Sequence, residues 1–226
     1  SFINVKYCTD NRYLSMQSFV RTGNAYGRDF AFHEIPDVLD PFDKHAFAAS
    51  PMTLEVVSTN LETGEADYHE VRDYDADLDY LIASSSMPLV SKTVEVDDKL
   101  LLDGGTADSV PLVHSLLTGA KKHVVVLTQA ADYVKKPNKL LALMRQRYAD
   151  YPYYLDRLAY RHYEYNRLYR WIAREEAAGR VFVIRPQKPV TVASMEHSAD
   201  KLLDLYEQGL ACAAEAWPAL QEYLAK

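Results

Sequence analysis

Asp103 is the residue whose type and position in the sequence best suit catalysis. Asp103 follows the apolar residues 100–102 and is followed directly by Gly104 and Gly105. A carboxylate at the end of a buried strand lies where α/β sheets place ligands and catalytic groups. The two glycines allow positive φ and the close approach of another backbone, so they are the predicted loop support for the aspartate. Because Asp-Gly-Gly is also an ordinary turn, these three residues alone leave catalysis and a turn as alternatives.

The other reactive side chains give weaker patterns. The serines at 84–86 end a predicted helix, where small residues favour close packing over a nucleophilic role. Asp97 and Asp98 are typical of a hairpin turn, and Asp108 favours a helix-capping or solvent role. The seven histidines show no metal-ligand spacing, so we expect surface or partly buried histidines and neither a metal site nor a cofactor. These are His33, His45, His69, His114, His123, His162 and His197.

The elements that must position Asp103 can be read from local patterns. Asp43 is a predicted cap for a helix over residues 44–49. Residues 53–59 and 65–71 predict one hairpin, and residues 93–96 and 99–102 predict a second that leads into Asp103. Between them, Asp77 falls in the first turn of a predicted helix, whose buried stripe is Leu78, Leu81 and Ile82. A short helix over residues 110–118 follows, with Ser109 as its cap and Pro111 in its first turn.

The second half of the chain alternates strands and helices. Residues 124–127 form a continuous apolar run, which is typical of a parallel strand buried on both faces, and residues 181–184 predict another buried strand. Residues 137–178 are helical. Their expected buried stripe is Tyr154, Leu158, His162 or Tyr165, Leu168 and Ile172. Ser198 begins a last helix that ends or bends at Pro218. Its expected apolar stripe is Leu202, Leu203, Tyr206, Leu210 and Ala213.

Several motifs together resemble one family. Residues 83–88 read Ala-Ser-Ser-Ser-Met-Pro, then come Asp103-Gly104-Gly105, Pro111 and the strand at 124–127, while residues 57–65 end in Thr-Gly-Glu. This order is similar to the C-terminal part of the patatin-like phospholipases, and residues 13–15 and 40–43 are similar to a bacterial branch. The resemblance covers residues 1–130. Residues 131–226, a helical region with a strand and a final helix, rest on periodicity alone.

The resemblance implies a fold and an activity. The fold would be a layered α/β/α arrangement with a mixed, mainly parallel central sheet, incomplete at its N-terminal side, in a single domain over residues 1–226. The activity would be a lipid acyl hydrolase acting on a lipid or ester through a Ser–Asp dyad. Asp103 would be the base, since a hydroxyl nucleophile needs one nearby. The mechanism implies no cofactor.

The sequence departs from that family in two places. It contains neither a Gly-x-Ser-x-Gly motif nor a glycine-rich oxyanion loop, and it holds eight glycines in all. We therefore expect the serine to come from a missing N-terminal segment of the same protein, which agrees with a chain that begins at Ser1, and we expect residues 1–226 alone to be inactive. Two alternatives stay open: a non-catalytic patatin-like binding or regulatory protein, and an unrelated α/β protein in which Asp103 only forms a turn.

Composition and charge limit the classes of partner that the protein can bind. A net charge of −7 argues against nucleic acid, and Cys8 and Cys212 are typical of thiols in a reducing compartment, so we predict a cytoplasmic protein. No apolar run is long enough for a membrane span. Residues 145–174 hold seven arginines against three acidic residues and are rich in tyrosine. They predict either an ordinary packed amphipathic helix or a lid that contacts a membrane surface peripherally.

Overall fold

The structure, a computed structural model, describes residues 2–226 and divides into two compact units. The four-stranded unit comprises Asp10–Ser109 and Pro137–Arg161. The two-stranded unit comprises the residues up to Thr9 together with Val110–Lys136 and His162–Lys226. The single domain expected over residues 1–226 stays a prediction.

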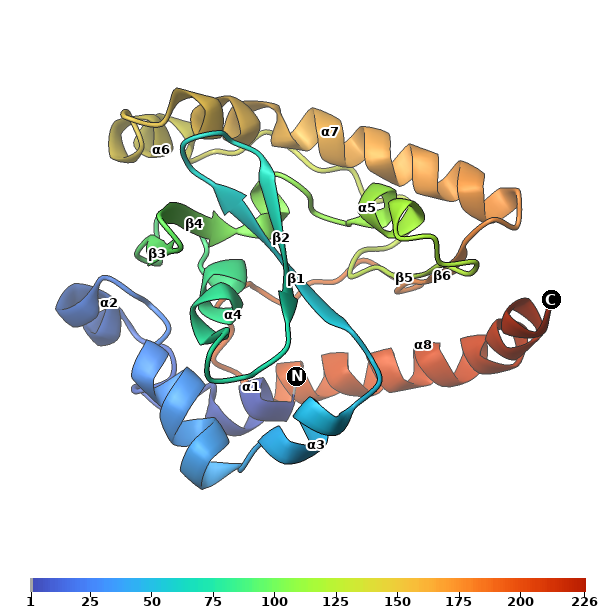
Figure 1. The fold of residues 1–226 in the computed structure, drawn as a ribbon, viewed down its shortest axis with the longest axis horizontal. Helices are drawn as coiled ribbons and strands as arrows, with labels where there is room; N and C mark the ends of the chain where they lie inside the picture. Colours follow the sequence, from blue (N-terminus) through green and yellow to red (C-terminus); the bar gives the residue numbers. More distant parts are fainter. Residues whose placement is uncertain (1) are drawn as a thin grey trace. The chain divides into compact units, whose positions relative to one another are not determined.

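A four-stranded sheet in the order β2-β1-β4-β3 is the centre of the first unit (Figure 1). Its strands are β1 (Leu54–Asn60), β2 (Ala66–Val71), β3 (Val94–Val96) and β4 (Lys99–Asp103). All three pairings are antiparallel. The two predicted hairpins are therefore confirmed. Asp97 and Asp98 form the turn of the second one at φ of 49° and 58°, in the left-handed region that Asp tolerates.

Helices cover this sheet on both faces, because successive strand residues point to opposite sides. Leu101 packs with helix α4 (Leu78–Ser85), where the predicted stripe is confirmed by buried Leu78 and Ile82. Leu102 faces the other way and packs with Met144. Its neighbours on that face come from α6 (Leu141–Arg147) and from the beginning of α7 (Pro152–Ala177).

Shorter helices precede the sheet in the chain. They are α2 (Met16–Thr22), the π-helix η1 (Phe30–Leu39) and α3 (Lys44–Ala49). The predicted cap of α3 is confirmed, because the Asp43 side chain accepts a hydrogen bond of 2.8 Å from the Ala46 N–H.

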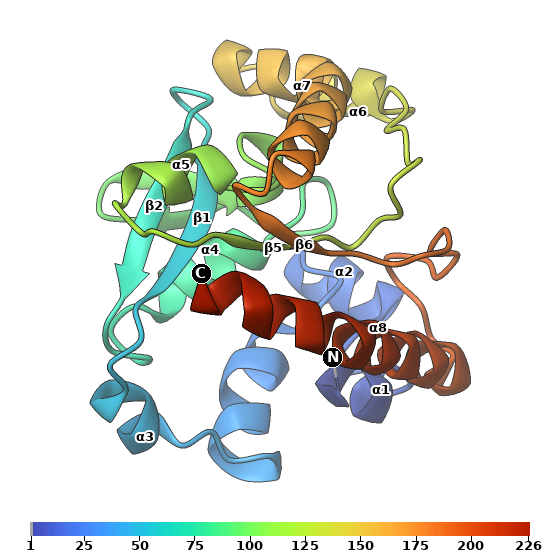
Figure 2. The ribbon, with the colours of Figure 1, turned by 90° about the vertical axis from the view of Figure 1, so that its right-hand side faces the viewer.

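The two-stranded unit is built on a parallel pair of strands, β5 (Val124–Val126) and β6 (Phe182–Ile184). It also contains α1 (Phe2–Tyr7), α5 (Leu112–Leu117) and α8 (Ala199–Ala225), and α1 packs along α8 (Figure 2). Its core joins one face of the strands to α5 and α7. The core residues are Leu112, Val125, Leu127, Tyr165, Tyr169, Ile172 and Val181. The predicted stripe of α7 is thus confirmed, with Tyr165 rather than His162 in the buried position.

Two expectations for strand β5 and helix α5 are wrong. Residues 124–127 are parallel as predicted but are not buried on both faces, since Val124 is 40% and Val126 69% exposed. A strand's burial depends on what covers it, and the core covers only the face of Val125. Ser109 does not cap α5. Its hydroxyl donates to the Gly105 carbonyl at 2.6 Å, and Pro111 takes the cap position.

Helix α8 differs from its predicted pattern. Ser198 caps it as expected, but the helix continues through the exposed Pro218 to Ala225. Leu203, Leu210 and Ala213 of the expected stripe are exposed. The large exposed apolar residues of this helix recur every seven positions, at Leu203, Leu210, Trp217 and Leu224.

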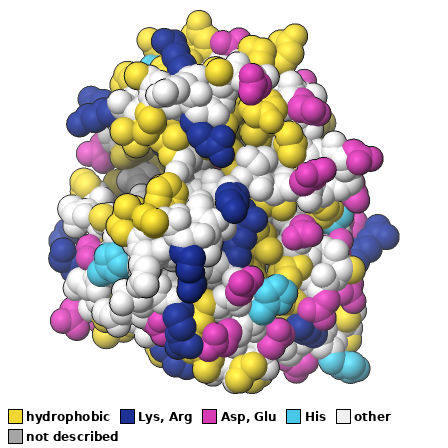
Figure 3. Space-filling view, turned by 90° about the vertical axis from the view of Figure 1, so that its left-hand side faces the viewer, with side chains coloured by type: hydrophobic (Ala, Val, Ile, Leu, Met, Phe, Trp, Pro, Cys, Tyr) yellow, Lys and Arg dark blue, Asp and Glu magenta, His cyan; other side chains and the backbone are white. Residues whose placement is uncertain are grey.

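The chain is therefore an α/β protein, but the mainly parallel central sheet is not confirmed. Among residues 2–226, three of the four strand pairings are antiparallel. Short hairpin turns force antiparallel pairing, whereas parallel pairing needs a longer crossover. No helix in this described part is both long and apolar enough to cross a bilayer. On the face drawn in Figure 3, basic, acidic and hydrophobic side chains lie interspersed.

Candidate functional site

Asp103 ends strand β4, and its backbone is held on both sides. Its N–H donates to the Ser86 carbonyl at 2.9 Å, and its carbonyl accepts a 2.9 Å hydrogen bond from the Thr59 hydroxyl. The same hydroxyl accepts from the Ala107 N–H at 3.1 Å. Neighbouring elements thus fix the main chain, and the carboxylate is left for other contacts.

Gly104 and Gly105 form the turn after Asp103, and only one of their two expected roles is found. The 3-10 turn η2 (Gly104–Thr106) has neither glycine at positive φ, so that part of the prediction is wrong. The predicted close backbone approach is confirmed at Gly104, where a Cβ atom would lie 2.5 Å from the carbonyl carbon of Val57. The Gly105 N–H donates to Asp103 Oδ1 at 2.8 Å. Glycine therefore lets the turn press against β1 and orient the carboxylate.

Helix α7 brings two further side chains to this carboxylate. A Cβ atom built on Gly105 would lie 2.9 Å from Asp103 Oδ1 and 3.0 Å from Arg161 Nη2, so the glycine leaves room for both. Tyr154 is fully buried about two turns before Arg161. Burial raises the pKa of Tyr154 most strongly, the Asp103 charge raises it further, and Thr106 and Arg161 oppose the shift.

Buried polar atoms without hydrogen bonds gather around Asp103. In the part of the chain that the structure describes, they include Ser58 Oγ, Thr106 Oγ1, Tyr154 Oη and Arg161 Nε, and of these only the Thr106 and Tyr154 hydroxyls lie close enough for Thr106 to lower the pKa of Tyr154. Ser58 is the strand partner of Asp103 in the register of β1 and β4. We call these four residues and Asp103 the Asp103 cluster. Buried polar groups are rarely left unpaired, so this concentration makes the Asp103 cluster the candidate site.

The electrostatics of Asp103 suit a base. Burial raises the pKa of its carboxyl above the ordinary value of 3.8, although the Gly105 N–H and the Arg161 charge both lower it. A higher pKa makes the carboxylate a stronger proton acceptor near neutral pH. The arrangement can accept a proton from a hydroxyl while Arg161 keeps positive charge nearby.

Arg161 gives a test of this balance. Arg161→Gln removes the charge that lowers the pKa of Asp103, so that pKa rises further. We expect the titration of the Asp103 carboxyl, followed by NMR, to move to higher pH. Arg145→Gln, at an exposed position on α6, is the matched control and leaves this titration in place. A titration that moves equally in both variants contradicts the assignment.

The remaining candidates from the sequence do not join this cluster. The Ser86 hydroxyl is buried and donates to the Ile82 carbonyl at 2.8 Å, and Ser85 also bonds within α4. Asp108 neither caps a helix nor faces solvent freely, because it accepts a 2.7 Å hydrogen bond from the Tyr68 hydroxyl. Within residues 2–226, no group of three or more acidic, His or Cys side chains could hold a metal ion.

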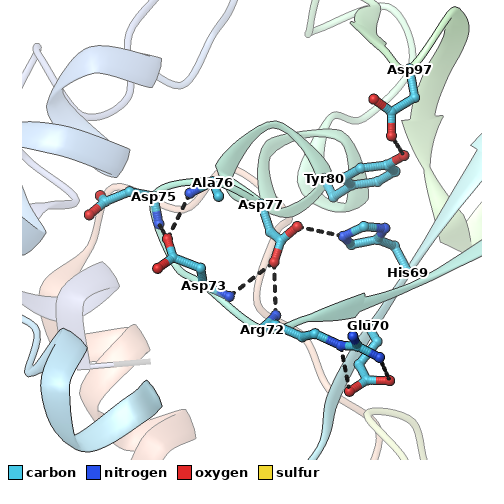
Figure 4. A network of polar contacts seen from close by, with 9 residues as sticks. All are labelled: His69, Glu70, Arg72, Asp73, Asp75, Ala76, Asp77, Tyr80 and Asp97. Atoms are coloured by element: carbon cyan, nitrogen blue, oxygen red, sulfur yellow. Dashed lines mark hydrogen bonds and ion pairs between the residues drawn. The ribbon is translucent and has the colours of Figure 1, made fainter.

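One histidine lies in a polar network that the sequence did not predict (Figure 4). His69 Nε2 lies 2.8 Å from Asp77 Oδ1, and its ring stacks on Tyr80 with centroids 3.5 Å apart. Asp77 Oδ2 accepts from the backbone N–H groups of Arg72 and Asp73 at 2.8 and 3.0 Å. Burial raises the pKa of Asp77, but these hydrogen bonds outweigh it and leave the pKa lowered.

The network acts on the fold rather than on a substrate, because Asp77 ties β2 and its following turn to the start of α4. Asp77→Ala removes its three hydrogen bonds, and we expect it to lower the free energy of unfolding by about 1–2 kcal/mol at neutral pH. Because the folded pKa is lowered, this stabilisation is present above 3.8 and is lost as the pH falls through the folded value. Urea titrations at pH 7 and pH 3 measure both effects, with the exposed Asp79→Ala as control. Equal losses at both pH values contradict it.

Sequence reasoning missed Arg161, Tyr154 and Ser58 as neighbours of Asp103. The sequence indicates Tyr154 only as a member of a buried stripe and Arg161 only as one of the seven arginines of residues 145–174. Arg161 is half-buried in the structure. No local pattern could have linked Tyr154 or Arg161 to Asp103, because α7 begins some fifty residues after Asp103 in the chain.

Comparison with known proteins places one segment of the chain. Residues 151–225 match a family described as a domain of unknown function (DUF6363), which covers α7, β6 and α8. No match was found among curated proteins.

Proposed function

We propose that this chain supplies the acidic half of a Ser–Asp lipid acyl hydrolase, with Asp103 as the base. The observation that carries the proposal is the Asp103 cluster: a partly buried carboxylate with a raised pKa, set among unpaired buried hydroxyls. The resemblance of residues 1–130 to the patatin-like phospholipases supports the same assignment. In this proposal the layered patatin-like arrangement extends beyond the strands described above.

The nucleophile of the proposed site is not among the described side chains. Residues 1–226 contain no Gly-x-Ser-x-Gly motif, so the proposal takes the serine from a further segment of the same protein. The serine hydroxyl would donate to the Asp103 carboxylate, which accepts the proton as the hydroxyl attacks an ester carbonyl. The Gly105 N–H holds the carboxylate in place during this step. Arg161 would limit the accumulation of negative charge in the cluster.

The test uses the intact protein and a fluorophosphonate, which labels an activated serine. We expect labelling of the wild type and no labelling of Asp103→Asn. Full labelling of Asp103→Asn removes Asp103 from the mechanism, and no labelling of the wild type favours the non-catalytic binding or regulatory protein. The lipid or ester that is hydrolysed is then found with a panel of phospholipids, lysophospholipids and simple esters.

Contact with a lipid surface belongs to the same proposal. Tyr153, Tyr160 and Tyr163 are exposed on α7, and so are Arg167 and Arg170. Amphipathic tyrosines and arginines suit the headgroup region of an anionic membrane. Arg161 does not contribute to this surface, since it is turned toward Asp103.

A further inference from the structure

A cavity of about 490 Å³ lies within the two-stranded unit. Its walls include Val126, Leu127 and Ile184, at the carboxyl ends of β5 and β6, and Leu205 on α8. The volume falls within the roughly 300–1,000 Å³ that small-molecule sites occupy. The carboxyl ends of parallel strands are also where α/β proteins usually bind ligands. Its position and size are those of a binding site with predominantly apolar walls.

A glycine forms part of the wall of this cavity. Gly209 lines it from the interior of α8, one turn after Leu205 and one turn before Cys212, on the same helix face. Glycine is unfavourable inside a helix, and close packing does not require it here, because a Cβ atom at this position would meet nothing within 4 Å. A larger side chain would project into the space that the cavity occupies.

The polar groups of the cavity leave one cation available. Arg185 forms an ion pair with Glu176, and Glu215 accepts a 2.8 Å hydrogen bond from Gln187. Lys188 also lines the cavity, and within residues 2–226 it has no ion-pair partner. Apolar walls with one unpaired ammonium group suit an apolar chain that ends in a single negative charge.

We propose that this cavity binds a free fatty acid, with the acyl chain against the apolar walls and the carboxylate at Lys188. The site lies wholly within the two-stranded unit and does not rest on the proposed hydrolase function. A lysophospholipid also carries a negatively charged head group, its phosphate, on an acyl chain. The experiment therefore has to distinguish a lysophospholipid from a free fatty acid.

Calorimetric titration of the full chain with sodium octanoate, decanoate and dodecanoate, each below its micellar concentration, measures binding. We expect affinity to rise about fourfold per added methylene until the chain fills the cavity. Acetate does not bind, and 1-dodecanol binds less tightly than dodecanoate. Dodecanoate also slows maleimide labelling of Cys212, which lines the cavity, whereas Cys8 is only 2% exposed and contributes little labelling.

Two substitutions locate the site. Gly209→Phe fills the cavity and lowers dodecanoate affinity by about tenfold or more, whereas Gly209→Ala retains it. Lys188→Gln, at an exposed position, lowers dodecanoate affinity by about two- to fivefold and leaves dodecanol binding unchanged. If Gly209→Phe fails to fold, Lys188→Gln decides. The proposal is overturned if dodecanoate does not bind, or if a lysophospholipid binds more tightly than dodecanoate. It is also overturned if Gly209→Phe and Gly209→Ala have equal dodecanoate affinities, or if the dodecanoate affinity of Lys188→Gln equals that of the wild type.

Discussion

Replacing Asp103 by Asn should lower ester hydrolysis by the intact protein about 10⁴-fold and, at neutral pH, raise its free energy of unfolding. The activity is lost because an amide cannot accept the proton of the nucleophile. The magnitude is that of Asp→Asn in a Ser-His-Asp triad, where the carboxylate orients the base instead of acting as the base. The amide oxygen can still accept the Gly105 hydrogen bond, so the turn is kept. Kinetics on an ester substrate and urea denaturation measure the two effects.

The stability gain follows from the raised pKa of Asp103. Burial makes the charged carboxylate unfavourable in the folded state, and Arg161 only partly offsets this. Below 3.8 the carboxyl is neutral in both the folded and unfolded states, so wild type and Asp103→Asn should be alike. As the pH rises through the raised folded pKa, the wild type loses stability relative to the variant. The difference then stays constant at higher pH.

Asp108→Asn is the matched control. It makes the same change five residues along the chain, where the carboxylate accepts from the Tyr68 hydroxyl. We expect its hydrolysis rate to remain close to that of the wild type. If Asp103→Asn keeps its activity while losing stability, Asp103 is a structural turn residue and the third interpretation of the sequence, an unrelated α/β protein, is favoured.

Replacing Gly104 by Ala should destabilise the four-stranded unit by more than the about 1–3 kcal/mol typical of overpacking. The new Cβ atom would lie 2.5 Å from the carbonyl carbon of Val57 and nearer still to its oxygen. Strand β1 cannot easily retreat, since it is paired with β2 on one side and β4 on the other. Urea denaturation followed by circular dichroism measures the loss.

A substitution at Gly105 should affect activity more than stability. Gly105→Ala meets side-chain ends, Asp103 Oδ1 and Arg161 Nη2, which can move, so its stability loss should be smaller than that of Gly104→Ala. It should still reduce hydrolysis by displacing the carboxylate. Gly209→Ala meets no atom within 4 Å, and we expect a gain of about 0.5–1 kcal/mol in its helix. Equal stability of Gly104→Ala and wild type would disprove the close approach at Val57.

Local sequence determined much of the secondary structure. Asp43 and Ser198 cap their helices through hydrogen bonds to N–H groups three residues away, and Asp97 and Asp98 close a hairpin between adjacent strands. These features depend on neighbours within a few residues, so residue types and spacing are sufficient. The sequence also indicated Asp103 at a strand end, because the apolar run and the following glycines are contiguous with it.

Tertiary structure alone decided the surroundings of these elements. Val124 and Val126 look like core residues in sequence, yet they are exposed because the core covers the opposite face of their strand. Asp103 acquires its raised pKa from burial, and its cationic neighbour Arg161 comes from a helix far along the chain. Burial and long-range charge depend on which distant segments meet. Local sequence therefore placed the carboxylate, and only the fold determined its electrostatic environment.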